Sequence, residues 1–497
     1  MILHSLIIYR NSGNSAARID KKQHVLPKRY KRQTAWIRRG SAPQYWPYHL
    51  VRRKAEVFFA SGGWDKAEAL YRSNIQMSAG DQTLSAEARS GLAKLIVNRG
   101  KIKESNDLLE SAQRIFSDLG DRARLAPVLR GRGVVCAYQG NFRRAQRFFA
   151  AAAAMARRSG DRAEFSHALG NLGIAYKSQG NYSKALECYR QEMTISEETG
   201  DLMNLASAFN NQGLVYKEMR RFGEALEHFE KALQIAERIG DRSTASYSYG
   251  NMGTVHHDRG SFSQALDMYQ RRLELTIHLG DRQSAAYTRI NMGLLEKQRG
   301  NYDEAEKLYN ESLETMDQLG DRRAVAIVTG KLADLYSTTG RRELARQNYQ
   351  NAVDKSRQLG IDYYLCDMLL HFALLALEEN DPRESSELAA SARVSAEKSG
   401  RKDLVLSCRI LQARLLSHED RERSISDLKT LEGECPEDEQ RAEALYHLYR
   451  IEPEEQLKEK LLKLYGTLWE RTPDHKYRVR INEIAGPAGS QPGEPAA

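Results

Sequence analysis

The chain has 497 residues, a net charge of +9, 28% charged residues and 8% aromatic residues, with few prolines. This composition favours a soluble, mainly helical protein, and strand-like alternation of apolar and polar residues is hard to find. No apolar run approaches the roughly 18 residues that cross a bilayer. The five cysteines are scattered singly, which excludes a small disulfide-stapled domain and favours a reducing compartment, so we expect a cytoplasmic protein.

The basic character is concentrated at the N-terminus. Residues 1–54 hold 13 Lys or Arg and a single acid, Asp20, a net charge of +12 that leaves the other 443 residues at −3. We predict that residues 1–41 form a basic, disordered leader. Because it is Arg-rich and poor in acids, an organelle transit peptide is the alternative.

From residue 42 the sequence repeats with a period of 40 residues. Glycine recurs at 80, 120, 160, 200, 240, 280, 320, 360 and 400, and Asp follows it at seven of these places, from Asp81 to Asp321. A second glycine series lies half a period later, at 100, 140, 180, 260, 300 and 340, with Arg220 and Asn380 as substitutes. A glycine in the left-handed conformation ends a helix, and an Asp after it can cap the next one.

Each period therefore predicts two helices joined by turns, with apolar residues three and four apart along each helix. Such a pair buries its apolar stripes only against neighbouring pairs, so the fold class is an all-α solenoid. We expect about nine repeats, near 42–80, 81–120, 121–160, 161–200, 201–240, 241–280, 281–320, 321–360 and 361–400. Residues 401–484 read as a helical cap with borders at Pro436, Pro453 and Pro473, and 485–497 as a disordered tail.

The repeats resemble the tetratricopeptide repeat (TPR) family. Leu172, Gly173 and Tyr176 match the L-G-x-x-Y of its first helix, and Ala185 with Tyr189 matches the A-x-x-x-F of its second. The 40-residue length and the "GDR" between repeats are similar to kinesin light chains and to Pins/LGN-type G-protein-signalling modulators. The resemblance implies a right-handed superhelix whose first helices line a concave groove that binds peptides.

Counting back from the L-G glycine places one residue set on the groove side of each first helix. The most regular member is asparagine, at Asn171, Asn211, Asn251 and Asn291. We predict a peptide-binding site made of these four residues together with Asn210, Lys177, Lys217, Lys297, Lys331, His167, Tyr247 and Tyr287.

The amide chemistry explains the expected ligand. An asparagine side chain both donates and accepts hydrogen bonds, so a ladder of them suits an extended peptide backbone, as the resemblance also implies. The lysines favour a somewhat acidic segment, although Glu218, Asp258 and Asp334 lie near the same side and would dilute the charge. In the alternative interpretation, the asparagines bond within their own repeat or to the next and fix helix register.

No nucleotide-binding loop, nucleophile elbow or zinc-protease motif occurs, so we expect neither an enzyme nor a bound cofactor or metal. The sequence favours a non-catalytic scaffold or adaptor for partner proteins in signalling or assembly. One alternative is binding of nucleic acid or an anionic surface through residues 10–54, where Tyr30, Trp36, Tyr45 and Trp46 lie among basic residues. Another is a sensor array that serves a separate signalling effector. The sequence leaves the oligomeric state open.

Overall fold

The structure is a computed structural model that describes residues 46–60, 64–78, 80–97 and 100–485. The predicted leader and the predicted tail beyond residue 485 lie outside the described residues. Every regular element in the described part is helical. None of the helices in these ranges combines the length and the apolar character that a membrane span requires.

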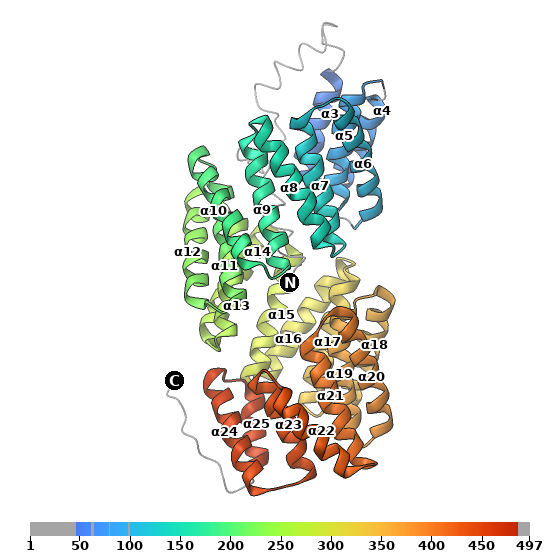
Figure 1. Cartoon of the computed structure of the whole chain (residues 1–497), viewed down its shortest axis with the longest axis vertical. Helices are drawn as coiled ribbons and strands as arrows, with labels where there is room; N and C mark the ends of the chain where they lie inside the picture. Colours follow the sequence, from blue (N-terminus) through green and yellow to red (C-terminus); the bar gives the residue numbers. More distant parts are fainter. Residues whose placement is uncertain (1–45, 61–63, 79, 98–99, 486–497) are drawn as a thin grey trace. The chain divides into compact units, whose positions relative to one another are not determined.

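The chain divides into two compact units, unit 1 (Met1–Ser248) and unit 2 (Tyr249–Ala497), and the division falls within helix α13 (Arg242–Asp258). Successive helices of each unit lie side by side (Figure 1). Unit 1 contains α3 (Trp46–Ala60), α4 (Trp64–Met77), α5 (Gln82–Val97), α6 (Ile102–Asp118), α7 (Arg122–Tyr138), α8 (Phe142–Ser159), α9 (Arg162–Ser178), α10 (Tyr182–Thr199), α11 (Leu202–Glu218) and α12 (Phe222–Ile239).

Unit 2 continues the helix pairs and then adds the C-terminal helices. Its elements are α14 (Phe262–Leu279), α15 (Arg282–Arg299), α16 (Tyr302–Gln318), α17 (Arg322–Thr338), α18 (Arg342–Leu359), α19 (Asp362–Glu378), α20 (Pro382–Ser399), α21 (Lys402–Leu415), the short 3₁₀ helix η2 (Leu416–His418), α22 (Arg421–Glu434), α23 (Asp438–Ile451), α24 (Glu455–Arg471) and α25 (His475–Ala485). Pro436, Pro453 and Pro473 lie in the connections between the last four helices.

The turns confirm the predicted helix ends and N-caps. Both glycine series adopt positive φ from Gly100 onward, and the two predicted substitutes do the same, with φ of 58° at Arg220 and 61° at Asn380. The Asp residues cap the following helices: the Asp161 side chain, for example, accepts a hydrogen bond from the Glu164 backbone N–H at 2.9 Å. The 40-residue period therefore sets where each helix begins and ends.

The glycine of each L-G motif makes room for an aromatic ring of the second helix. A Cβ added to Gly173 would lie 2.5 Å from Cε1 of Tyr189, and one added to Gly293 would lie 2.8 Å from Cε1 of Tyr309. Both rings are fully buried. These glycines therefore have a structural role, since the ring packs the first helix of a repeat against its second.

Unit 2 contains a long-range contact that the sequence did not predict. The connection between α24 and α25 packs on the turn at Gly260, where an added Cβ would lie 2.9 Å from Cδ of Pro473 and 3.0 Å from the Arg471 carbonyl oxygen. Nearby, Gln298 donates from Nε2 to Oδ2 of Asp474 at 3.1 Å, and the Tyr302 hydroxyl lies 2.9 Å from Nδ1 of His475. The last helices of unit 2 thus return to its first ones.

Candidate functional site

The predicted site residues lie on the first helices of five consecutive repeats, α9, α11, α13, α15 and α17. Asn171 and Asn211 belong to unit 1, whereas Asn251 and Asn291 belong to unit 2. In unit 1, α9 contacts α11 directly, so these two asparagines lie on neighbouring helices at the same repeat position. Asn171 and Asn211 thus form one pair in unit 1, and Asn251 and Asn291 form another in unit 2.

Asn171 and Asn211 are buried but not bonded. Their side chains are 2% and 1% exposed, and the Nδ2 atom of each has no hydrogen-bond partner among the described residues. A buried donor without an acceptor costs about 1–3 kcal/mol. The register bonds that the alternative interpretation requires are not made by these two amides in the described part of the chain.

Two other asparagines of unit 1 do make such bonds between repeats. Asn204 donates from Nδ2 to Oγ of Ser166 at 2.8 Å, and Asn210 donates from Nδ2 to Oγ of Ser248 at 3.0 Å. Each bond joins residues 38 positions apart, and all four residues are buried. Asn210, a predicted peptide-binding residue, thus holds neighbouring helices together. The repeated 38-residue Ser and Asn spacing is the signal that could have revealed these pairs from sequence.

The polar residues beside the ladder are partly buried. His167 and Tyr247 of unit 1, and Asn251, Asn291 and Tyr287 of unit 2, all lie between the buried and exposed classes. Burial, together with the charge of Asp321, raises the pKa of Tyr287, so its hydroxyl remains protonated at neutral pH. Tyr287 can therefore donate a hydrogen bond as well as offer an apolar ring.

The lysines of unit 1 are poorly solvated. Burial lowers the pKa of Lys177 to about 8, an effect that Lys217 reinforces and Glu218 opposes. Lys217 is itself buried, with its Nζ 3.7 Å from Oε1 of Glu218. In a neighbouring repeat, Arg130 forms a bidentate ion pair with Glu164. Its Nε donates to Oε1 at 2.6 Å, and its Nη2 donates to Oε2 at 3.1 Å. Burial therefore disfavours the charged form of Lys177.

The lysines of unit 2 are held by aspartates. Nζ of Lys297 lies 2.5 Å from Oδ2 of Asp334, and Nζ of Lys331 lies 3.7 Å from Oδ2 of Asp367. Burial opposes ionisation of Asp334, but Lys297, His371 and Lys331 outweigh it and hold the Asp334 pKa well below its usual value. The sequence placed Asp334 near these cations, but it did not identify the pairing or the contribution of Asp367.

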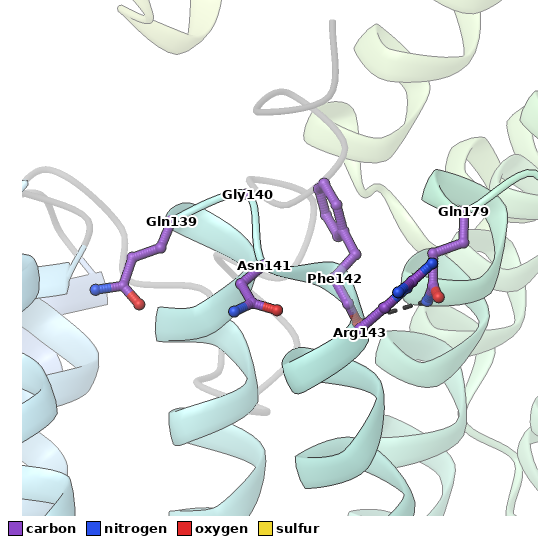
Figure 2. Close-up of a pocket in the computed structure, with 6 residues that line it drawn as sticks. All are labelled: Gln139, Gly140, Asn141, Phe142, Arg143 and Gln179. Carbon is purple, nitrogen blue, oxygen red and sulfur yellow. Dashed lines mark hydrogen bonds between the residues drawn. The ribbon is translucent and has the colours of Figure 1, made fainter. Parts of the chain in front are cut away.

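A separate hollow lies outside this residue set, at the turn between α7 and α8. Figure 2 shows its lining, which combines the turn residues Gln139, Gly140 and Asn141 with Phe142 and Arg143 of α8 and with Gln179. The hollow is shallow, with a volume of about 490 Å³. Gln179 spans two repeats there, because its Nε2 donates to Oε1 of Gln146 at 3.1 Å.

Stacked helix pairs with a 40-residue period define an all-α solenoid repeat protein. Residues 124–198, 204–277 and 283–358 each match the family model described as "Tetratricopeptide repeat". The chain therefore contains tetratricopeptide repeats, as the sequence predicts. The finer similarity to kinesin light chains and to Pins/LGN-type proteins remains a resemblance.

Two solved structures with TM-scores above 0.5 share this fold. The apo quorum sensor NprR from B. thuringiensis is 14% identical, with a TM-score of 0.51 over 71% of this chain and 99% of its own. The STAND protein PH0952 from Pyrococcus horikoshii, which has a tetratricopeptide repeat sensor, is 15% identical, with a TM-score of 0.51 over 70% of this chain and 52% of its own. BtubC (BKLC) from P. vanneervenii is 22% identical over 45% of this chain and 92% of its own, with a TM-score of 0.38. A search of the curated proteins finds no match.

Proposed function

We propose that the chain is a non-catalytic scaffold that binds extended peptide segments of partner proteins along the first helices of its repeats. The observation that carries this proposal is the pair Asn171 and Asn211, whose Nδ2 donors are buried without an acceptor among the described residues, while the Nδ2 donors of Asn204 and Asn210 nearby bond serine hydroxyls of adjacent repeats. A peptide carbonyl would supply the missing acceptor. Unpaired buried donors are rare in proteins. Two of them at equivalent positions of successive repeats are better explained by ligand binding than by accident.

The spacing of the helices suits an extended backbone. Packed helices lie about 8–10 Å apart, which corresponds to about three residues of extended peptide at about 3.3 Å each. Asparagines on adjacent first helices could therefore hold carbonyls about three residues apart without reading the side chains between them. Because both amides are nearly buried, binding requires the side chains that cover them to change rotamer, which is common at interfaces.

We propose that the bound peptide carries an acidic side chain where it passes Lys177. Burial lowers the Lys177 pKa to about 8, so its ammonium is still largely charged at pH 7 but poorly solvated. A ligand carboxylate would compensate that charge. In unit 2, the carboxylates of Asp334 and Asp367 lie close to the lysines of the first helices and would oppose an acidic segment there.

A role in signalling or assembly in the cytoplasm completes the proposal. All five cysteines are free and buried, in keeping with a reducing compartment. The solved structures with the same fold include a quorum sensor and a protein with a tetratricopeptide repeat sensor, and the present chain could likewise serve a separate effector.

The test compares two double variants of the full chain. Asn171→Ala/Asn211→Ala removes the unpaired amides, whereas Asn204→Ala/Asn210→Ala removes the amides that bond between repeats. The probe is a peptide selected against the wild-type chain from a random decapeptide library, and its binding is measured by fluorescence anisotropy. The first variant should lose at least tenfold in affinity with unchanged or higher thermal stability. The second should retain binding and lose about 1 kcal/mol for each bond removed.

Backbone recognition has its own control. A version of the peptide with ester linkages in place of amides has weaker carbonyl acceptors. It should bind the wild-type chain more weakly than the amide peptide does. On the Asn171→Ala/Asn211→Ala variant, the same replacement of amides by esters should cost less affinity. Equal binding of the selected peptide by that variant and the wild type would overturn the proposal. So would a loss of stability in that variant as large as in the control.

A further inference from the structure

Helix α8 differs in charge from every equivalent helix of the described chain. It carries five arginines, Arg143, Arg144, Arg147, Arg157 and Arg158, and no acidic residue. Every other second helix from α4 to α20 contains at least two acids. The segment that precedes it adds no acid after Asp121, so residues 122–160 contain only basic charges.

The arginines form one exposed row on unit 1. Arg143, Arg147, Arg157 and Arg158 are spaced as residues on one helix face, and the exposed residues between the two ends of the row are Ala150 and Ala154. None of these four guanidinium groups makes a hydrogen bond or ion pair with another described residue. At 1.5 Å per residue the row is about 22 Å long. It begins beside the hollow of Figure 2, where Arg143 points away from the α7–α8 turn.

We propose that this outer face of α8 binds the phosphate backbone of nucleic acid without reading its sequence. Duplex DNA carries one negative charge per about 1.7 Å of axis, so a row of this length faces a nearly continuous line of phosphates. Arginine is suited to them because its planar fork donates two parallel hydrogen bonds to one phosphate. The inference is independent of peptide binding by the first helices.

Two other anionic partners fit the face less well. A membrane-binding helix needs large apolar side chains to insert, and the exposed residues between these arginines are alanines. An acidic protein surface would gain only exposed ion pairs, each worth about 1 kcal/mol or less, against an association cost of at least about 4 kcal/mol. A polyanion instead releases several condensed counterions at once, which is a sufficient driving force without an apolar core.

The test replaces Arg143, Arg147, Arg157 and Arg158 by Gln in the full chain and measures binding to a fluorescein-labelled 24-base-pair DNA duplex as a function of salt. Arg144 is retained because its guanidinium lies over the Phe148 ring. Each lost phosphate contact lowers the slope of log K against log salt by about 0.9, so the slope should fall by about 3 to 4. The dissociation constant near 0.1 M salt should rise at least tenfold.

The control removes the same charge from neighbouring second helices. Lys184 and Arg190 of α10 and Lys231 and Arg238 of α12 are exposed, but each of these helices also contains four acids. Replacing all four by Gln should change the dissociation constant less than threefold. Circular dichroism and melting of both variants show whether the fold is retained.

Three outcomes would overturn the proposal. The first is a wild-type chain that does not bind the duplex. The second is an α8 variant that binds like the wild type while deletion of residues 1–41 abolishes binding, which would assign the activity to the leader. The third is a wild-type chain that binds phosphatidylserine vesicles but not the duplex, with the same four arginines required. Unchanged DNA binding by Asn171→Ala/Asn211→Ala would separate this site from the peptide site.

Discussion

In unit 1, the side chains of Asn171 and Asn211 are buried without hydrogen-bond partners among the described residues, and burial lowers the pKa of Lys177. In unit 2, the lysines of the corresponding first helices are bound by carboxylates, with Lys297 2.5 Å from Asp334. The same fold and the same repeat register therefore support opposite arrangements. On these first helices, unit 1 has two buried amide donors without an acceptor among the described residues, whereas unit 2 pairs Lys297 and Lys331 with aspartates.

This difference separates binding from stability. An unsatisfied buried donor destabilises the free protein and is compensated when a ligand supplies the acceptor, so such groups are candidates for a binding site. A buried ion pair is already compensated, and a ligand would have to displace its carboxylate. We therefore expect unit 1 to contribute most of the affinity for a peptide and unit 2 to contribute mainly rigidity.

The turns show a second difference between the units. Gly180 of unit 1 and Gly260 of unit 2 have the same conformation, with φ of 74° and 72°. An added Cβ would meet nothing within 4 Å at Gly180, whereas at Gly260 it would meet Arg471, Thr472 and Pro473 within 3.0 Å. The same glycine thus serves only the backbone in one unit and also a docking contact in the other.

The largest effect is expected for Gly260→Ala. The left-handed conformation alone costs a non-glycine residue about 1–2 kcal/mol, and the contact with residues 471–473 adds a packing cost of about 1–3 kcal/mol. The α24–α25 connection should move away, so hydrogen exchange of α25 and of the Gly300 turn should accelerate. Mass spectrometry of the exchanged peptides measures this.

Gly180→Ala is the matched control, because it carries the conformational cost without the contact. It should destabilise its own turn and leave α25 protected. Equal protection of α25 in both variants would mean that the docking contact contributes nothing measurable.

An intermediate effect is expected for Asp334→Asn in unit 2. The substitution removes the partner of Lys297, and bonds to charged groups are worth about 1.5–3 kcal/mol. Since Lys297, His371 and Lys331 outweigh burial and lower the Asp334 pKa, the wild type should lose this stabilisation as pH falls below the ordinary value of 3.8. The variant should lack that acid-dependent loss.

Hydrogen exchange of α15 and α17 at pH 7 and pH 3 measures both effects. Glu311→Gln is the control, because its pair with Arg289 is more exposed and should contribute less than about 1 kcal/mol. If Asp334→Asn changed protection no more than Glu311→Gln, the internal pairing in unit 2 would not be a source of rigidity.

The fold was predictable because its signals are local and repeated. A positive φ at Gly160 and a capping Asp161 are each dictated by a few neighbouring residues, and the period multiplies the signal. The positions of Asn171 and Asn211 on adjacent first helices follow from the same period. Their lack of a partner does not, because it depends on which side chains of adjacent helices reach them.

Contacts between distant segments were harder to predict from the sequence. The pairs Asn204 with Ser166 and Lys297 with Asp334 join adjacent repeats, and only a search at spacings near 38 residues would suggest them. The contact of Asp474 with Gln298 spans 176 residues and has no repeat signature. It depends on how the C-terminal helices of unit 2 return to α15, which no local pattern specifies.

The smallest effect is expected for Lys177→Met in unit 1. Burial lowers the Lys177 pKa from its ordinary 10.5 to about 8, so between these values the unfolded chain binds more protons than the folded one and wild-type stability rises with pH. The variant should be more stable than the wild type below pH 8, by about 1 kcal/mol because partial exposure screens the charge. The difference should vanish near pH 10.5.

Melting from pH 6.5 to 10.5 measures this difference, and Lys184→Met, an exposed lysine of the next helix, is the control. If Lys177 pairs with a ligand carboxylate, its replacement should also lower the affinity for an acidic peptide more than the affinity for a neutral one. If the variant were more stable but its peptide preference were unchanged, the charge of Lys177 would not contribute to peptide binding. The asparagines would then be the source of affinity in unit 1.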